Sequence, residues 1–431
     1  MTHLLRAFAL TSLMLALAGG VHAGRHAERK AERQADPAAR GGDTAPDPAI
    51  PACGPQRCLV TVAGGHLQRD GRPWTPKGVV LTGLVAPEPY LRGIYARSRE
   101  AWGPQLLRQL QDIGVDTLRF NVSAAGLDPD NPMPDRRMGP EAKRVYLAQI
   151  VEAVELGARY GMNSIVTITS GDVTGASDSE RVPGQEAVRG WRVLAPLLAK
   201  QPSVVFNAFN EPDYGGTSRI DTDPKPWQEW RAGYQLMVDA IRASGARQPI
   251  ILDGLDMSRV WRRLTEAQVP HDPLAQLVYD IHPFPTDSGQ HRKTGKAKID
   301  YHSPEHIEHW LGGWCERHAC IASAFYSGSA GNPAKAHCYD ARNAPAPGLD
   351  SARITDDFLD YFDRRQIGVL AFAGDWPFRV FDRPGQPGAR LTGFPSAMRV
   401  QGCAQSERMY GPGERLRDHW LRLRRQEGAP R

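Results

Sequence analysis

Lysine is scarce in this sequence of 431 residues, where it supplies 9 of the 53 basic side chains and arginine supplies the rest. The formal net charge is only +5, and charged residues make up 23% of the chain. This balance excludes an acidic or basic polymer-like chain. A nucleic-acid binder would need a basic face interleaved with aromatic side chains, and the arginine cluster at 415–425 is too local for that. We therefore expect no nucleic-acid partner.

Long hydrophobic runs are also lacking, except near the N-terminus. His3 and Arg6 precede an apolar run at 7–18, and Val21-His22-Ala23 supplies the small residues of a cleavage site. This order is typical of a secretory signal peptide, which we assign to residues 1–23; the alternative is an uncleaved N-terminal anchor. No other segment approaches the roughly 20 apolar residues that span a bilayer. We expect a secreted or periplasmic protein with no membrane association after signal cleavage.

Cysteine is limited to six residues, and none forms a CxxC or Cys/His pattern with zinc-like spacing. In an oxidising compartment six cysteines indicate disulfides. Cys53 and Cys58 are close enough for a local loop, and the other pairings stay open. The sequence also lacks the GxGxxG, P-loop and GxSxG patterns of nucleotide binding and serine hydrolysis, so we predict no cofactor and no metal. The remaining cysteines are Cys315, Cys320, Cys338 and Cys403.

The composition changes along the chain. Residues 24–57 are rich in Ala, Arg, Asp and Pro and have little apolar content, which predicts a disordered linker. The segment 59–71 has the pattern of short strands and turns that cap the bottom of a barrel. From there to residue 431 we predict one domain. Its 10 tryptophans suit a flat, sugar-like ligand, although Trp227, Trp230 and Trp261 lie in helical stretches and are expected to be packing residues.

Strand-like and helix-like segments then alternate, and the helical patterns are clearest at 140–160 and 412–426. Eight short apolar strands, each followed by a helix, predict an α/β fold, the (β/α)8 TIM barrel, over residues 58–431. The long loops 283–303, 325–349 and 376–410 would lie on the rim after the strands, where such barrels place their active sites. The predicted strands are 77–82, 115–121, 162–168, 203–207, 249–253, 276–281, 319–324 and 367–373.

The most informative motif is Asn210-Glu211-Pro212, which follows the fourth predicted strand. At the barrel rim Glu211 would be half buried, and burial would raise the pKa of its carboxyl as a general acid requires. Asn210 would hydrogen-bond a substrate hydroxyl beside it. In isolation the same motif is equally typical of a turn at the start of a helix.

In this position the chain resembles glycoside hydrolase family 5, in which the acid/base Glu follows an Asn at the end of strand four. Lys77 to Leu81 resembles the family's first strand, and Leu118-Arg119-Phe120 resembles the second, whose Arg lies under the active site. Ile281-His282-Pro283 resembles the sixth, whose His lines the sugar pocket. The resemblance covers roughly residues 59 to 380 and implies a carbohydrate-active barrel in which Arg119, Asn210 and His282 bind substrate.

Three departures from the family pattern are physically coupled. Ala324 stands where the resemblance implies the nucleophilic Glu of strand seven. After His282 the family often has a Tyr that contacts this nucleophile, and here Phe284 stands there. Near strand three the family often has Asp-x-His, whereas residues 167–170 of this chain are Thr, Ile, Thr and Ser. A Tyr that orients a carboxylate has no role once the carboxylate is gone.

A retaining glycosidase needs two carboxyls about 5–5.5 Å apart, and Ala324 cannot attack a sugar. Three hypotheses stay open. In the first, another carboxylate replaces the missing nucleophile. The first candidate is Asp375 after strand eight, which could instead only cap a loop, and the second candidate is Asp253. Alternatively, the barrel binds saccharide without cutting it. In the third, Glu211 works with a substrate group as nucleophile, or the protein transfers sugars.

An aromatic platform is expected beside these groups. Trp376 follows strand eight, where related enzymes stack a Trp under the sugar, although Phe372 competes for that role. We expect a monomer that acts on a β-linked polysaccharide or oligosaccharide, with a non-catalytic carbohydrate-binding protein on the same barrel as the alternative.

Overall fold

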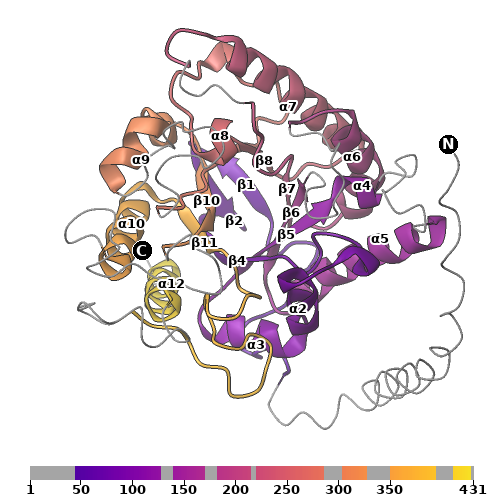
Figure 1. Cartoon of the computed structure of the whole chain (residues 1–431), viewed down its shortest axis with the longest axis vertical. Coiled ribbons are helices and arrows are strands. Elements are labelled where there is room, and N and C mark those ends of the chain that lie inside the picture. Colours follow the sequence, from indigo (N-terminus) through magenta and orange to yellow (C-terminus); the bar gives the residue numbers. More distant parts are fainter. Residues whose placement is uncertain are drawn as a thin grey trace, which may run out of the picture. The chain divides into compact units, whose positions relative to one another are not determined.

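Eight parallel strands close into a barrel in this computed structural model, which describes residues 44–127, 139–169, 182–214, 220–285, 303–327, 350–394 and 411–428 (Figure 1). The strands pair in chain order, and the last pairs with the first through Val369 and Lys77. All eight predicted strands and the predicted TIM barrel are confirmed. The barrel strands are β4 (Lys77–Leu81), β5 (Thr117–Ser123), β6 (Asn163–Thr169), β7 (Val204–Asn207), β8 (Ile250–Asp253), β9 (Leu277–Asp280), β10 (Cys320–Phe325) and β11 (Gly368–Ala371).

Helices surround the barrel (Figure 1). The predicted helix at 140–160 is α5 (Pro140–Arg159), and Pro140 occupies its first turn, where no backbone N–H is needed. The remaining α-helices are α2 (Ile94–Ala101), α3 (Pro104–Asp112), α4 (Ala124–Leu127), α6 (Gln185–Leu198), α7 (Lys225–Ala243), α8 (Leu255–Ser258), α9 (Pro304–Leu311), α10 (Ser351–Arg365) and α12 (Gly413–Gly428). Short 3-10 helices are η2 (Glu88–Tyr90), η5 (Glu266–Gln268) and η6 (Trp314–Glu316).

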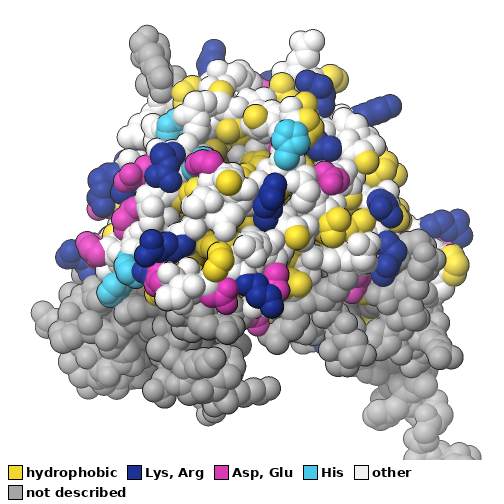
Figure 2. Space-filling model, turned by 90° about the horizontal axis from the view of Figure 1, so that it is seen from above, with side chains coloured by type: hydrophobic (Ala, Val, Ile, Leu, Met, Phe, Trp, Pro, Cys, Tyr) yellow, Lys and Arg dark blue, Asp and Glu magenta, His cyan; other side chains and the backbone are white. Residues whose placement is uncertain are grey.

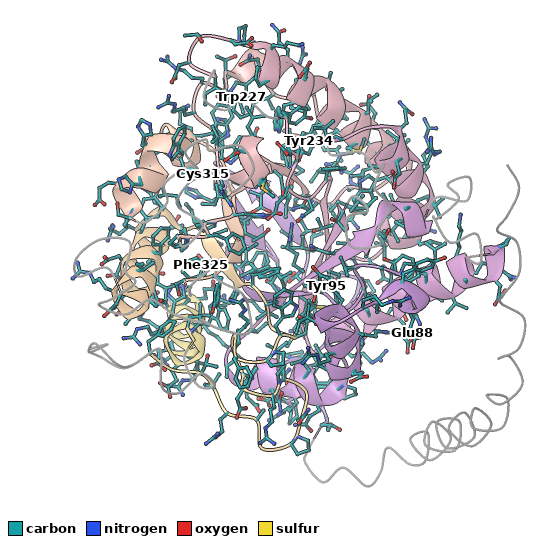
Figure 3. All side chains as sticks on the ribbon, in the orientation of Figure 1. Glu88, Tyr95, Trp227, Tyr234, Cys315 and Phe325 are labelled. Atoms are coloured by element: carbon teal, nitrogen blue, oxygen red, sulfur yellow. A yellow bond between two sulfur atoms is a disulfide. The ribbon has the colours of Figure 1, made fainter. Side chains whose placement is uncertain are left out.

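Tryptophan packs mainly between the helices and the outside of the barrel. Trp227 and Trp261 stack with ring centroids 6.0 Å apart, and Trp230 contacts both edge-on. All three side chains are at most 1% exposed, which confirms them as packing residues. Truncating such a buried aromatic to Ala typically costs about 3–5 kcal/mol. In Figure 3, Trp227 and Tyr234 accordingly lie out among the helices rather than inside the ring of strands.

The lower half of the barrel interior is aliphatic and closed from below. A small antiparallel sheet, β1 (Val60–Ala63), β2 (His66–Arg69) and β3 (Arg72–Pro73), supplies Val60, Leu67 and nearby Trp74 to the same buried cluster. The predicted cap of the barrel bottom is therefore confirmed. The barrel strands contribute Ile165, Val205, Ile251, Val278, Ile321 and Leu370 to this cluster.

The segment 44–57 packs on this end of the molecule instead of behaving as a linker. The N–H of Cys53 donates to the carbonyl of Ala158 at 2.8 Å, and the N–H of Asp47 donates to Gln111 at 2.7 Å. The predicted Cys53–Cys58 disulfide is present and links the segment covalently to the residues just before β1. The folded part of the chain therefore begins before the predicted boundary at residue 58, because hydrogen bonds and a disulfide compensate for the lack of apolar side chains.

A second local disulfide joins Cys315 and Cys320. Cys338 and Cys403, like the predicted signal peptide, lie outside the described residues. Within the described ranges, no helix combines the length and the hydropathy needed to cross a membrane. On the described surface that Figure 2 shows, basic and acidic side chains are interspersed rather than gathered in one patch of a single sign.

Candidate functional site

A polar layer lies directly above the aliphatic layer inside the barrel. Side chains alternate along a strand, so the residue two positions after an inward aliphatic residue also points inward. In this way Val205, Ile251, Val278 and Ile321 are each followed by an inward polar residue. These polar residues are Asn207, Asp253, Asp280 and Ser323, each 0% exposed. A buried layer with this much charge must be paired internally.

Glu211 lies at the rim just above this layer. It follows the end of β7 by four residues and has a φ of 49°, an unusual conformation for a residue other than glycine. Its N–H donates to Asp253 Oδ2 at 2.8 Å, which holds the turn. Its Oε1 lies 2.7 Å from Nδ1 of His282, and its side chain is 28% exposed. Glu211 is therefore half-buried at the rim, as predicted.

His282 connects Glu211 to the polar layer. The residue is fully buried, and its Nε2 lies 3.2 Å from Asp280 Oδ2, 3.3 Å from Ser323 Oγ and 3.7 Å from Asp253 Oδ2. Burial alone would lower the pKa of His282, but the charges of Asp280 and Asp253 raise it to about 10. At neutral pH His282 is therefore an imidazolium that donates from both ring nitrogens.

The protonation state of Glu211 differs from the sequence-based prediction. Burial does favour a raised pKa, but the hydrogen bond and charge of His282, together with Arg119 and Arg259, lower the pKa of Glu211 below its ordinary value. The predicted rise is wrong because the buried cation outweighs desolvation. An ionised Glu211 accepts hydrogen bonds at neutral pH and has no proton to give to a leaving group.

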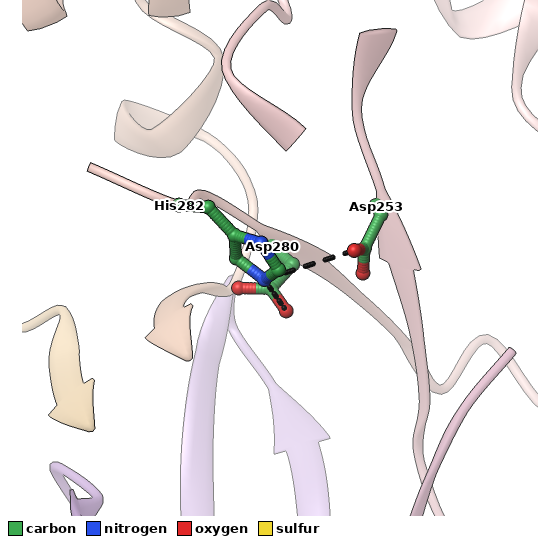
Figure 4. Close-up of side chains that lie close together, drawn as sticks. All are labelled: Asp253, Asp280 and His282. Atoms are coloured by element: carbon green, nitrogen blue, oxygen red, sulfur yellow. Dashed lines mark hydrogen bonds and ion pairs between the residues drawn. The ribbon is translucent and has the colours of Figure 1, made fainter. Parts of the chain in front are cut away.

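Asp253, Asp280 and His282 also form the cluster whose donor atoms best suit a metal ion, since one ligand atom from each lies within 4.8 Å of the others (Figure 4). Asn207 Nδ2 already donates to Asp253 at 2.9 Å and to Asp280 at 3.1 Å, and Ser323 N donates to Asp280 at 2.9 Å. Burial and the charge of Asp280 raise the pKa of Asp253 to about 7. The imidazolium and these donors satisfy the cluster as an ionic network.

Arg119 lies beneath Asn210, where the resemblance places it. Its side chain is 1% exposed, and it donates to Asn121 Oδ1 at 3.1 Å and to Asn210 Oδ1 at 2.8 Å. These bonds fix which way the Asn210 amide faces. The amide oxygen is used by Arg119, and the NH2 group is left as the donor for a ligand hydroxyl.

Ala324 lies in an apolar part of the rim. The register of β10 against β11 shifts between Ala322 and Phe325, and both Ser323 and Ala324 contact interior residues. Ala324 is 2% exposed and packs with Val80 and Ala373. Three half-buried aromatic residues cover this cluster. They are Phe284, Phe372 and Trp376.

Asp375 and Trp376 both hold the loop that follows β4. Asp375 Oδ2 accepts the N–H groups of Thr82 and Gly83, at 2.5 and 3.1 Å, and Asp375 is 2% exposed. Trp376 Nε1 donates to Thr82 Oγ1 at 2.8 Å. This geometry favours the loop-capping role of Asp375 over attack on a sugar, and it leaves the face of Trp376 on the rim.

A comparison with protein-family models finds a match that covers most of the residues described above. The family model for cellulase, glycosyl hydrolase family 5, matches residues 88–318, more than half of the chain. The chain belongs to glycoside hydrolase family 5. The matched segment contains Arg119, Asn210, Glu211 and His282, and it ends before β10, which carries Ala324.

Solved family 5 structures have the same fold at low identity. A β-glucanase from Saccharophagus degradans, solved with cellotetraose, is 18% identical with a TM-score of 0.55, covering 90% of this chain and 99% of the other. The catalytic domain of an endoglucanase from Thermobifida fusca is 13% identical with a TM-score of 0.51, covering 84% and 97%. The catalytic domain of the major endoglucanase from Xanthomonas campestris is 16% identical with a TM-score of 0.51, covering 86% and 99%. No curated protein matches the chain.

Tyr95 is a rim residue of this family 5 barrel that the sequence did not indicate. Its ring meets Trp376 edge-on, with the ring centroids 6.1 Å apart. Burial and the charges of Glu211 and Asp375 raise the pKa of Tyr95. No local pattern marks a tyrosine on α2 as a neighbour of carboxylates that follow β7 and β11.

The titration of Asp375 gives a first prediction. Burial raises the pKa of Asp375 to about 7 from an ordinary value of 3.8. A raised folded-state pKa means that the stabilisation is complete below about pH 3.8 and is lost as pH rises toward 7. Wild type should therefore lose stability relative to Asp375→Asn as the pH rises from about 4 to 7. The difference in free energy of unfolding should change by a few kcal/mol. Urea unfolding at several pH values measures it.

The exposed Asp418→Asn on α12 is the matched control, and its stability should follow that of the wild type across this range. A constant difference between Asp375→Asn and wild type from pH 4 to 7 would contradict the assignment of a buried, proton-holding Asp375.

Proposed function

We propose that this family 5 protein binds a β-linked glucan across the C-terminal rim of its barrel without cleaving it by the two-carboxylate route. The observation that carries the proposal is the surroundings of Ala324, which is buried among apolar and aromatic side chains at the position that the resemblance assigns to the nucleophile. The retaining route requires a second carboxyl about 5–5.5 Å from the first. Ala324 supplies none.

The binding groups that support this proposal are polar and aromatic, as sugar recognition requires. The ionised Glu211 would accept from a sugar hydroxyl, and the Asn210 amide, oriented by Arg119, would donate to one. Trp376 and Tyr95 offer aromatic rings on the same rim. The S. degradans β-glucanase, a structural neighbour, was solved with cellotetraose, which supports a cello-oligosaccharide as the first ligand to test.

Hydrolysis is the second candidate, and membership of a glycosidase family favours it. The charges of both Glu211 and Asp375 act on the rim residue Tyr95, so both carboxyls lie in the neighbourhood of one rim side chain. Their pKa values are shifted in opposite directions, with Glu211 lowered and Asp375 raised to about 7, as in an acid and base pair. In this scheme Asp375 would give the proton and Glu211 would activate water. The two backbone bonds to Asp375 and its burial count against it.

The proposed location is the periplasm or the exterior of the cell, and the proposed state is a monomer. The two disulfides of the described residues support an oxidising compartment, and the predicted signal peptide at 1–23 supports export. A soluble, exported barrel would meet polysaccharide directly.

A panel of β-glucans tested for both binding and reducing-end release decides between the two candidates. Glu211→Gln removes the negative charge and keeps the shape. Under the binding proposal, the wild type binds without turnover, and the variant binds about 10-fold more weakly because it loses a charge-assisted acceptor. Turnover by the wild type that Glu211→Gln abolishes would overturn the proposal in favour of hydrolysis.

A further inference from the structure

Arg379 is a buried cation beside the rim whose charge the site does not use. It belongs to the segment after β11 and is only 9% exposed. Its guanidinium carbon lies 3.7 Å from the ring centroid of Tyr326 and 5.5 Å from that of Trp376. The rings favour the cation electrostatically, and the Tyr326 side chain also forms a hydrogen bond with Arg379.

One donor atom of Arg379 lacks a partner. Nη1 is buried and makes no hydrogen bond, and no carboxylate of the described residues forms an ion pair with this side chain. The acids nearest in sequence are engaged elsewhere, since Asp375 accepts from Thr82 and Gly83, and Asp382 accepts from Arg390. A buried, unpaired N–H of a charged group is costly unless something fills the position.

Arg379 lies close to the part of the barrel rim where the ligand is proposed to bind. Tyr326 comes two residues after Ala324 on the same chain segment, and Trp376 packs on the cluster that contains Ala324. Trp376 also contacts Tyr95, whose pKa is raised in part by Glu211. The guanidinium therefore lies next to Trp376, at the part of the rim where a sugar would stack.

We propose that Arg379 binds the carboxylate of an acidic sugar residue, so that the ligand is a β-linked glucan that carries uronic acid or a carboxylate substituent such as a pyruvate ketal. The planar guanidinium fork matches a carboxylate better than a sugar hydroxyl does. The inference rests on the proposed binding of a β-linked glucan and deepens it by naming the charge of the ligand.

The test compares ligands on the unaltered protein. Calorimetric titration uses cellotetraose, cellotetraose with one residue oxidised at C6 to glucuronate, and cellotetraose with a pyruvate ketal. We expect at least one acidic ligand to bind about 10- to 100-fold more tightly than the neutral one, with the preference decreasing at higher salt. The two acidic ligands separate the two sources of the carboxylate. Equal affinity for all three would overturn the inference and leave the proposed function standing, whereas no binding of any would end both.

Variants locate the preference. Arg379→Gln should abolish the preference for the acidic ligand and leave cellotetraose affinity within about 3-fold, while Arg379→Lys keeps the charge without the fork and should retain only part of it. The exposed Arg97→Gln on α2 is the matched control and should retain all of it. An undiminished preference in folded Arg379→Gln would overturn the assignment. If that variant does not fold, the ligand comparison on the wild type still decides.

Discussion

Replacing His282 with Asn is expected to cost about 3–5 kcal/mol of stability at neutral pH, the usual cost of removing one partner from a buried ion pair. The imidazolium contacts Glu211 and Asp280 directly and lies 3.7 Å from Asp253. An Asn side chain carries no charge, so the buried carboxylates would repel one another without compensation. Urea unfolding of both proteins measures the loss.

The pH dependence of this loss follows from the raised pKa of His282, which moves from 6.5 to about 10. Stabilisation by a group with a raised pKa is complete below the unfolded value and is lost as pH rises through the folded value. The contribution of the His282 charge to the difference between wild type and His282→Asn should therefore be complete below about pH 6.5 and should shrink toward pH 10.

His66→Asn on the exposed side of β2 is the control, and it should change stability by no more than about 0.5 kcal/mol. A loss for His282→Asn as small as that of the control, or one that grows toward pH 10, would show that His282 is not the cation of the network.

If the wild type binds glucan without cleaving it, as proposed, replacing Ala324 with Glu is expected to create β-glucan hydrolysis. Ser323, the residue before Ala324, lies 3.3 Å from one ring nitrogen of His282, and Glu211 contacts the other. A carboxylate at 324 would supply the second carboxyl that the retaining route requires, and its negative charge would raise the pKa of Glu211 toward that of a proton donor. Nucleophiles of hydrolases contribute roughly 10⁶-fold to turnover, so even an imperfect one should raise reducing-end release about 100-fold above background.

Two controls for Ala324→Glu each remove one of the two carboxyls. Ala324→Gln places a side chain of nearly the same volume there and should stay inactive, and Ala324→Glu combined with Glu211→Gln should also be inactive. Thermal unfolding checks that a charge among Phe284, Phe372 and Trp376 is tolerated. A folded Ala324→Glu protein that binds glucan but releases no reducing ends would contradict the equivalence of position 324 with the nucleophile.

The barrel was predictable because each strand is a short apolar run between helical patterns, and a parallel strand buried on both faces requires that composition. The polar layer was predictable in principle, since Ile251-x-Asp253 and Val278-x-Asp280 place an acid two positions after an inward aliphatic residue. The motif Asn210-Glu211-Pro212 indicated the site for a similar reason, because it follows a strand end.

The lowered pKa of Glu211 was not predictable from its own surroundings in the sequence. It depends on His282, 71 positions away, and on the acids that keep His282 protonated. A loop-capping role for Asp375 was among the predictions, but its partners Thr82 and Gly83 were not predictable, because they lie nearly 300 positions earlier. Electrostatic effects of this kind arise from convergence in space, and no local pattern records which strand ends converge.

The small sheet that seals the barrel from below determines how a long polymer meets this protein. Val60, Leu67 and Trp74 fill the lower mouth, so nothing can pass through the barrel along its axis. Under the proposed function, a glucan must therefore approach from the upper edge, the side that carries Glu211 and Trp376.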